Sequence, residues 1–200
     1  MSYLNTFKAG GPMFTAALLL LLSSSRSQLT AQEIKFKPTP WYVPKAVAFL
    51  DNFLIEHPDS QVLEFGAGGS TIWLASRAGH VLSIEHNKKW WSGILERLTF
   101  LGLRDKVDLR LMAPPYYTVC ADMPDNFFDV IIVDGRNRKG CISHSIDLLK
   151  PGGVLILDNS DRVYYHAVFG LMEGWQTDYG LSGKWETRWW FKPQVEDRGA

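Results

Sequence analysis

Residues 62–70 read Val-Leu-Glu-Phe-Gly-Ala-Gly-Gly-Ser, a short apolar strand that runs directly into a glycine-rich turn. The three glycines allow the backbone to reverse with positive φ and to approach a ligand where a Cβ would collide. Ser70 and Thr71 then open a helix whose free N–H groups point back toward the same ligand. The stretch therefore predicts a ligand site at a strand-to-helix turn.

The acid at position 64 distinguishes two kinds of ligand for this turn. A glycine-rich strand-to-helix turn also holds dinucleotides, so the glycines alone are ambiguous. The Glu64 carboxylate would repel a pyrophosphate, but it can accept a hydrogen bond from the ammonium group of an amino-acid ligand. The stretch resembles motif I of the class I S-adenosylmethionine-dependent methyltransferases, whose cofactor carries an aminocarboxypropyl group. This resemblance implies cofactor contacts from Glu64, Phe65, Gly66, Ala67, Gly68, Ser70 and Thr71.

Length and composition fit one compact domain. The chain has 200 residues, of which 46% are hydrophobic, so it can bury a sizeable core. Its 21 basic and 21 acidic residues give a net charge of zero, which argues against a nucleic-acid partner. Cys120 and Cys141 form no metal-type cluster, and we expect both thiols to be reduced and partly buried in a cytoplasmic protein.

The N-terminus carries the segment that bears on the compartment. Residues 13–22 are almost wholly apolar, follow Lys8 and precede three serines, which is roughly the layout of a signal peptide. The segment is too short to span a bilayer, which takes about 20 residues, and a methyl donor of the implied kind is kept in the cytosol. We therefore expect no membrane partner. We expect residues 1–43 to form a helical extension, begun at Pro12, that packs as a lid over a methyltransferase domain at 44–200.

From residue 44 onward, helical and strand patterns alternate in the βαβ manner. Helices are predicted over residues 44–56, 70–78, 88–101, 140–149 and near 161–173. Strands are predicted over 61–65, 80–84, 107–111, 128–133 and 153–157, and a hairpin over 175–179 and 185–192, around Gly180 to Gly183. The predicted fold is α/β, with a doubly wound, mostly parallel seven-stranded sheet. The C-terminal antiparallel hairpin is what the methyltransferase resemblance implies.

Ligands of such sheets bind outside the carboxyl ends of the strands, so the residues at those ends nominate a site. Glu85 and His86 end the second predicted strand. An acid at that place takes the ribose hydroxyls of an adenosine ligand in methyltransferases, as it does in dehydrogenases. We therefore add Glu85, His86 and the strand-end acid Asp134 to the predicted cofactor contacts.

A second, narrower resemblance concerns two later strands. In the catechol-type, divalent-metal-dependent O-methyltransferases, an acid after the fourth strand and an Asp-Asn pair after the fifth together hold magnesium. Asp134, Asp158 and Asn159 occupy the matching places, and all three offer the oxygen ligands that Mg²⁺ prefers. The alternative is that Asp134 is the usual cofactor-side acid, while Asp158 and Asn159 cap the following helix.

The group that would take a proton from the acceptor is less clearly marked. The metal-dependent enzymes place a lysine base three residues after the strand-end acid, where this chain has Asn137. The nearest lysine is Lys139, and histidines suit proton transfer near neutral pH. The predicted catalytic residues are Asp134, Lys139 and His144, with His86 and His166 as further candidates.

Basic residues cluster beside the predicted site. Arg136, Arg138 and Lys139 precede a helix, with Arg162 expected near them in space, and cations at a helix N-terminus oppose its dipole. The run is either a solvated loop or the mouth of a pocket. Two fork-shaped guanidiniums suit a carboxylate or phosphate, so Arg136 and Arg162 are the predicted contacts to an anionic substrate.

The sequence thus predicts a methyltransferase that moves the cofactor's methyl group to a small molecule, with oxygen as the expected acceptor atom. The reaction would be an in-line displacement at the sulfonium methyl, helped by proximity and by a base or metal. Two alternatives stay open. One is a non-catalytic protein that keeps the cofactor pocket, and the other is an NAD-dependent reductase. The reductase would want a third glycine where Thr71 stands.

Overall fold

The computed structural model describes residues 37–194. The compact unit that contains the sheet begins at Pro38, so the connector 38–43 belongs to it. The expectations of a signal peptide or a lid fall on the preceding segment, which lies outside the described residues. Between residues 37 and 194, no helix is both long and apolar enough to cross a membrane.

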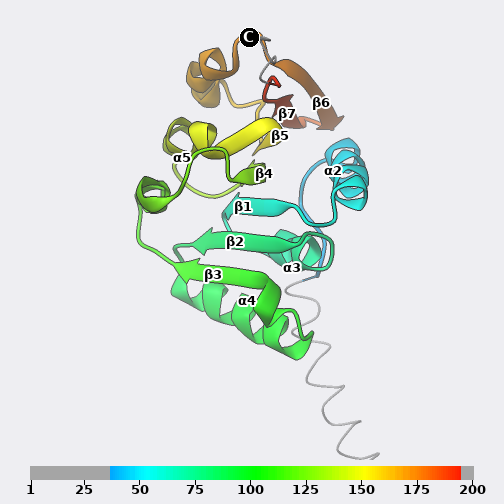
Figure 1. The fold of residues 1–200 in the computed structure, drawn as a ribbon, viewed down its shortest axis with the longest axis vertical. Helices are drawn as coiled ribbons and strands as arrows, with labels where there is room; N and C mark the ends of the chain where they lie inside the picture. Colours follow the sequence, from blue (N-terminus) through cyan, green and yellow to red (C-terminus); the bar gives the residue numbers. More distant parts are fainter. Residues whose placement is uncertain (1–36, 195–200) are drawn as a thin grey trace, which may run out of the picture. The chain divides into compact units, whose positions relative to one another are not determined.

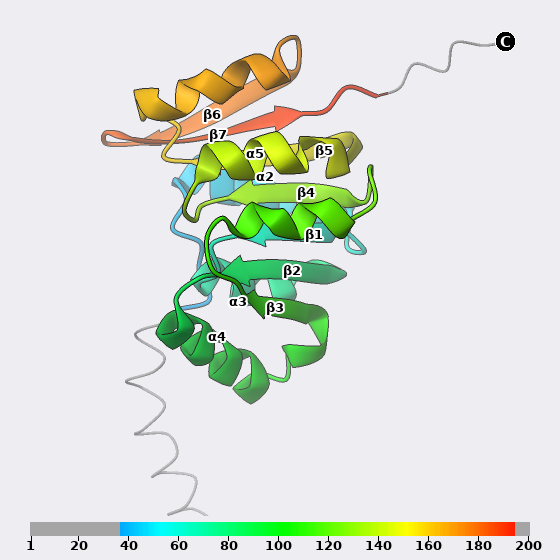
Figure 2. The same cartoon turned by 90° about the vertical axis from the view of Figure 1, so that its left-hand side faces the viewer.

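Seven strands form one sheet in the order β3-β2-β1-β4-β5-β7-β6 (Figure 1). The five strands from β3 to β5 run parallel, whereas β7 is antiparallel to both β5 and β6. Figure 2 shows the β6–β7 hairpin at the edge opposite β3. The predicted fold class is therefore confirmed. The strands are β1 (Gln61–Phe65), β2 (His80–Glu85), β3 (Val107–Leu111), β4 (Phe128–Val133), β5 (Leu149–Asp158), β6 (Gln176–Ser182) and β7 (Trp185–Phe191).

Helical segments cover both faces of the sheet. Figure 1 shows α2 and α3 on one face and α5 on the other. On the first face α4 packs beside α3, and on the second α5 contacts η2 and η4. These positions follow from right-handed crossovers between parallel strands. The segments are α2 (Pro44–Glu56), α3 (Gly69–Ala75), α4 (Lys88–Phe100), η1 (Arg104–Lys106), η2 (Tyr116–Asp122), α5 (Arg138–Ser145), η3 (Ile146–Leu148) and η4 (Val163–Met172).

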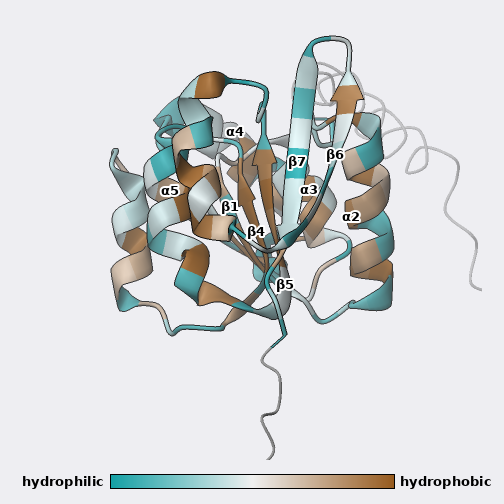
Figure 3. Cartoon of the chain, turned by 90° about the horizontal axis from the view of Figure 1, so that it is seen from above, coloured by the Kyte–Doolittle hydropathy of each residue, from teal (hydrophilic) through white to brown (hydrophobic). Residues whose placement is uncertain are grey.

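The core lies in the central strands, whose apolar side chains are shielded on both faces. Leu63, Ile131 and Leu155 are fully buried, as expected for a parallel sheet covered by helices. Figure 3 shows the hydrophobic colouring concentrated on β1 and β4. On β7, the Trp189 ring stacks on Phe49 of α2, with ring centroids 4.7 Å apart. The two cysteines are buried and unbridged.

The observed elements differ from the predicted ones in several places. The helix predicted over 140–149 is α5, which begins at Arg138 after Asn137 adopts a left-handed backbone with φ of 52°. β6 continues through Gly180 to Ser182, and a Cβ on Gly180 would lie only 2.7 Å from a Val43 methyl group, so only glycine fits where β6 passes the connector. The segment η2 was not predicted. Its residues lie in the stretch between β3 and β4, for which the sequence pattern gave no helix.

Candidate functional site

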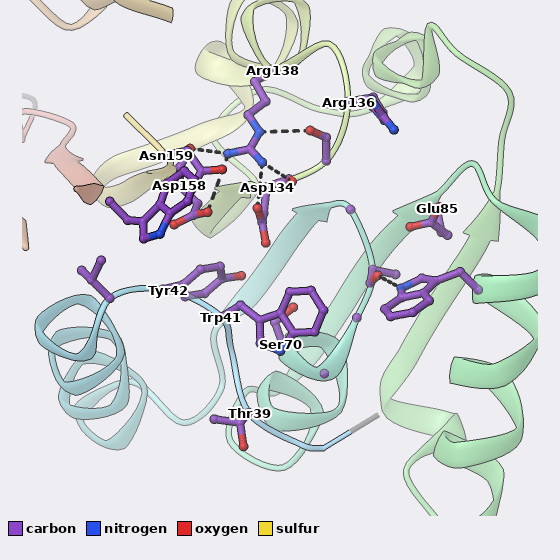
Figure 4. Close-up of a pocket in the computed structure, with 18 of the residues that line it drawn as sticks. Thr39, Trp41, Tyr42, Ser70, Glu85, Asp134, Arg136, Arg138, Asp158 and Asn159 are labelled. Atoms are coloured by element: carbon purple, nitrogen blue, oxygen red, sulfur yellow. Dashed lines mark hydrogen bonds and ion pairs between the residues drawn. The ribbon is translucent and has the colours of Figure 1, made fainter. Parts of the chain in front are cut away.

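A cavity of about 850 Å³ opens at the carboxyl edge of the sheet (Figure 4). The segments that follow β1, β2, β4 and β5 line it, and the connector 38–43 and the β6–β7 turn complete its wall. Open parallel sheets bind their ligands at this edge. The structure therefore brings together most of the predicted site residues: Gly66, Ala67, Gly68, Ser70, Glu85, His86, Asp134, Arg136, Asp158, Asn159 and Arg162.

In the turn after β1, Gly66 and Gly68 lack a side chain for different structural reasons. Gly66 has a φ of 101°, and a Cβ there would lie 2.6 Å from the Gly135 backbone, so the turns after β1 and β4 touch directly. Gly68 is extended, with a φ of −170°. Among the described residues, the nearest atom to a Cβ on Gly68 would be the Ser70 hydroxyl at 3.8 Å, and this glycine lines the cavity. A positive φ was expected at Gly66, Gly68 and Gly69, but of these three only Gly66 adopts it.

Glu64 supports the turn from beneath and does not line the cavity. Its oxygens accept hydrogen bonds from the hydroxyls of Ser70, Thr71 and Ser83, each 2.5 Å long. Ser83 is its partner in the parallel β1–β2 register, so both side chains point to the same face of the sheet. The Thr71 hydroxyl also accepts from the Gly68 N–H at 2.9 Å. The contact of Glu64 with a ligand ammonium stays a prediction, and in this structure the carboxylate is occupied by the three hydroxyls.

The burial of Glu64 predicts a pH dependence of stability. Burial raises the pKa of Glu64 from 4.5 to about 7, against the effect of the three hydroxyls. The folded chain then binds this proton more tightly than the unfolded chain, so the contribution favours folding at low pH and declines between pH 4.5 and about 7. One pKa unit corresponds to about 1.4 kcal/mol, so the loss is about 3 kcal/mol.

Urea unfolding of wild type and Glu64→Gln at several pH values measures this effect. The difference in unfolding free energy between the two proteins should change in favour of Glu64→Gln as the pH rises toward 7. A difference that stays constant across that range would show that Glu64 is ionised in the folded chain at acid pH.

Two other predicted cofactor residues, Phe65 and Thr71, also lie away from the cavity lining. Phe65 is fully buried and stacks on Tyr116, with ring centroids 6.0 Å apart. Thr71 is committed to Glu64 and to the Gly68 backbone. Both side chains hold the turn in shape, which is a supporting role.

At the end of β2, Glu85 is held in position by backbone groups. Its Oε1 accepts from the backbone N–H groups of His86 at 2.8 Å and Asn87 at 2.6 Å. The residue is only 4% exposed, yet it lines the cavity. The Trp90 indole donates to the Ala67 carbonyl at 2.6 Å and so ties α4 to the glycine turn. A fixed carboxylate at this place suits the ribose hydroxyls predicted for it.

At the ends of β4 and β5, the Arg138 guanidinium lies between two carboxylates (Figure 4). Its Nη2 donates to Asp134 Oδ1 at 2.9 Å, and its Nη1 lies 3.8 Å from Asp158 Oδ2. The other oxygen of Asp158 accepts from the Thr187 hydroxyl at 2.6 Å. Burial and the neighbouring Asp158 raise the pKa of Asp134, while Arg138 opposes that rise. The structure thus brings Asp134 and Asp158 close together, with the Arg138 guanidinium between their carboxylates.

The predicted magnesium site does not fit this geometry. Asp134, Asp158 and Asn159 do come together at the cavity, but the guanidinium takes the position between the carboxylates that an ion would need. Across residues 37–194, no cluster of three or more histidine, cysteine, aspartate or glutamate side chains could hold a metal ion. Asn159 adopts a left-handed backbone with φ of 49° where the chain turns after β5.

The predicted bases on α5 lie outside the cavity lining. The Lys139 ammonium sits 3.8 Å from the ring centroid of Tyr164. The exposed His144 ring stacks on Tyr117, with centroids 4.1 Å apart, and its Nδ1 lies 2.8 Å from the Gly140 carbonyl. Because α5 begins at Arg138 and buries that residue, its neighbour Lys139 faces another direction. Of the three predicted catalytic residues, only Asp134 lines the cavity.

The two predicted substrate arginines line the opening of the cavity, and both are exposed. The Arg162 guanidinium lies 6.0 Å from the ring centroid of Trp185, which also lines the cavity. Neither arginine side chain has an ion pair within the part of the chain that the structure describes. Both guanidiniums are therefore available to a ligand.

The connector 38–43, for which the sequence predicted no part in the site, brings Tyr42 to the cavity wall. The backbone N–H of Val43 donates to the Thr187 hydroxyl at 3.3 Å, and this bond fixes the connector to β7. The Tyr42 hydroxyl approaches Ser70 but makes no hydrogen bond within residues 37–194. Burial, then the charges of Glu64 and Asp134, raise its pKa. An unpartnered buried hydroxyl at a cavity wall is well placed to bind a ligand.

Solved structures share this arrangement at low sequence identity. An O-methyltransferase from Bacillus cereus in complex with S-adenosylhomocysteine is 20% identical, with a TM-score of 0.64 over 84% of this chain and 90% of that one. TomG, an O-methyltransferase from Streptomyces achromogenes involved in tomaymycin synthesis and solved with S-adenosylmethionine, is 19% identical, with a TM-score of 0.59 over 72% and 78%. This chain has the class I methyltransferase fold.

The methyltransferase fold occurs with different acceptors. An rRNA methylase from Streptococcus thermophilus is 18% identical, with a TM-score of 0.59 over 73% of this chain and 95% of that one. Because function depends on the site rather than on the fold, this likeness does not select the acceptor. No family model matches the chain.

One curated protein is similar in sequence. Highly reducing polyketide synthase 40 of Fusarium mangiferae is 28% identical over an alignment of 145 residues, and the match covers 66% of this chain and 6% of that protein. The chain therefore spans only a small part of that relative's length.

Proposed function

We propose that this protein is an S-adenosylmethionine-dependent methyltransferase that methylates a hydroxyl oxygen of a small molecule in the cytoplasm. The observation that carries the proposal is one continuous cavity. It joins a glycine turn and a fixed Glu85 carboxylate at one side to Asp134, Arg136 and Arg162 at the other. The first group suits the cofactor and the second suits an acceptor, so the two reactants meet inside one space.

The chemistry of the lining residues supports a site for the cofactor. Glu85 would accept hydrogen bonds from the ribose hydroxyls, and the backbone at Gly66 and Gly68 would admit the aminocarboxypropyl group, because neither glycine carries a side chain to fill that space. Tyr42, whose hydroxyl has no partner among the described residues, would contact the ligand from the connector side. The acceptor would then occupy the part of the same cavity next to Asp134.

The transfer is an in-line displacement. The C–O bond to the acceptor forms as the C–S bond of the sulfonium breaks, giving the methyl ether and S-adenosylhomocysteine. The hydroxyl proton passes to the Asp134 carboxylate, which lines the cavity while Arg138 fixes one of its oxygens. Proximity and orientation supply most of the acceleration, and proton transfer adds about 10²–10⁴-fold.

A methyl-transfer assay tests this function. Labelled S-adenosylmethionine is offered with a panel of hydroxylated small molecules, and methylated product is expected from at least one with wild type. Asp134→Asn should lower turnover about 10²–10⁴-fold while it binds S-adenosylhomocysteine as wild type does. Cofactor binding without transfer to any acceptor, in both proteins, would favour the non-catalytic alternative.

The arginines at the opening predict an acceptor that carries a negative charge. Arg136 and Arg162 present forked donors that match a carboxylate or phosphate. For an acidic acceptor, Arg162→Gln should raise KM about tenfold, the loss of one charge-assisted hydrogen bond. Its kcat should change little.

Steady-state kinetics with an acidic acceptor and its neutral methyl ester measure the effect. The exposed Lys88 on α4, which does not line the cavity, gives a matched charge control as Lys88→Gln. If Arg162→Gln changed the KM for the acid and for the ester equally, Arg162 would not bind the negative charge of the acceptor and would belong to a solvated loop.

A further inference from the structure

We propose that the Arg138 guanidinium is a built-in cation that takes the place of a divalent metal ion between Asp134 and Asp158, so that this site binds no metal. The inference deepens the proposed function, because it concerns the same cavity. It is tested by metal binding, however, and that readout does not depend on methyl transfer.

The guanidinium is held by hydrogen bonds on three sides. Its Nε donates to the Gly135 carbonyl at 3.0 Å, and its Nη2 donates to the Asp134 carbonyl at 2.7 Å and to Asp134 Oδ1 at 2.9 Å. Its Nη1 donates to the Asp158 carbonyl. A guanidinium has five N–H donors, so these four bonds leave little freedom to turn away. Arg138 is therefore fixed between the ends of β4 and β5.

Burial keeps the guanidinium where it is. Arg138 is only 7% exposed, and the Tyr165 ring faces its guanidinium, with the centroid 5.5 Å away. Leaving the two carboxylates would strand a buried charge on each side, which is costly. A divalent ion entering the same space would meet the guanidinium at contact distance and be repelled. The arginine therefore both satisfies the carboxylates and excludes an ion.

Removing the guanidinium should expose an oxygen-lined space. The carboxylates of Asp134 and Asp158 would then face each other with the Asn159 residue beside them at the cavity. Two carboxylates and an amide oxygen are ligands that hard divalent cations accept, with water completing the shell. The proposal therefore predicts that Arg138→Ala gains a metal site that wild type lacks.

Manganese titration followed by electron paramagnetic resonance gives a direct test, because bound Mn²⁺ loses the sharp signal of the free ion. Wild type should leave the free signal unchanged at submillimolar Mn²⁺, whereas Arg138→Ala should remove about one equivalent. Adding Asp158→Asn to Arg138→Ala should abolish that binding. Arg136→Ala is the matched control, since it removes a neighbouring arginine that forms no ion pair with the described carboxylates, and it should bind no Mn²⁺.

Mn²⁺ binding by wild type that is lost in Asp158→Asn would overturn the proposal, and so would a folded Arg138→Ala that binds none. If Arg138→Ala does not fold, Mn²⁺ added during refolding should restore its thermal unfolding transition. If Arg138→Ala folds under no condition, the wild-type titration alone tests the proposal: Mn²⁺ binding that depends on Asp158 contradicts it, and no binding supports it. A wild type that binds no Mn²⁺ and also transfers no methyl group would contradict the proposed function while supporting this inference.

Discussion

Gly68→Val is expected to abolish binding of S-adenosylhomocysteine while leaving the fold intact. The extended backbone at Gly68 accepts any side chain, and a Cβ there would meet no atom of the described residues closer than 3.8 Å. In the ligand-free protein the new side chain therefore enters the cavity rather than the core. A cofactor whose aminocarboxypropyl group lies against this backbone would collide with it, and we expect affinity to fall at least about 100-fold, or about 2.7 kcal/mol.

Calorimetric titration and thermal unfolding of the same Gly68→Val sample separate the two effects. The unfolding free energy should stay within about 0.5 kcal/mol of wild type, as for other changes that disturb no packing. Gly170→Val offers a comparison outside the cavity, because a Cβ at Gly170 meets no atom of residues 37–194 within 4 Å. Wild-type affinity in Gly68→Val would place the cofactor elsewhere.

Gly66→Ala, unlike Gly68→Val, should greatly lower the free energy of unfolding. A Cβ at Gly66 would lie 2.6 Å from the Gly135 backbone, and its φ of 101° is one that side chains rarely adopt. The backbone strain costs about 1–3 kcal/mol and the overlap adds about 1–3 kcal/mol. The expected loss is therefore about 2–6 kcal/mol, enough to unfold many domains of this size.

Gly102→Ala is the control for Gly66→Ala. Gly102 has a φ of 68°, but a Cβ at this position would meet no atom of the described part of the chain within 4 Å. The substitution therefore carries the strain without the overlap. Urea unfolding should show a clearly smaller loss for Gly102→Ala. Equal losses would mean that the turns after β1 and β4 do not pack directly against each other.

The sheet and the edge that carries the site could be predicted because buried parallel strands leave a plain sequence pattern. The run ending at Val133 and the run ending at Leu157 are continuous apolar stretches that stop at an acid. An acid at the exposed end of a buried strand lies at the carboxyl edge, where ligands bind. Glu85, Asp134 and Asp158 each end a predicted strand, and all three line the cavity.

The role of Glu64 could not be predicted, because it depends on a neighbour from another strand. Ser83 reaches Glu64 only through the β1–β2 register, and a single sequence does not show which residues pair. Ser70 and Thr71 were predicted to open a helix whose backbone N–H groups face a ligand, and the hydrogen bonds from their hydroxyls to Glu64 were not predicted.

The position of Lys139 and His144 relative to the cavity could not be predicted from the sequence. The sequence pattern placed Arg138 and Lys139 in the loop before a helix beginning at 140, whereas α5 begins at Arg138 and includes both. Arg138 is buried beside the acids that end β4 and β5, whereas Lys139 and His144 do not line the cavity. The spacing of Asp134 and Arg138, four residues apart, was the one available signal for their pairing.

Titration calorimetry of wild type with S-adenosylhomocysteine and, separately, with NAD⁺ is the most direct measurement of the central claim that this cavity is a methyl-donor site. We predict micromolar binding of S-adenosylhomocysteine, with one ligand per chain, and no heat of binding from NAD⁺. Binding of NAD⁺ without binding of S-adenosylhomocysteine, or binding of neither, would contradict the claim.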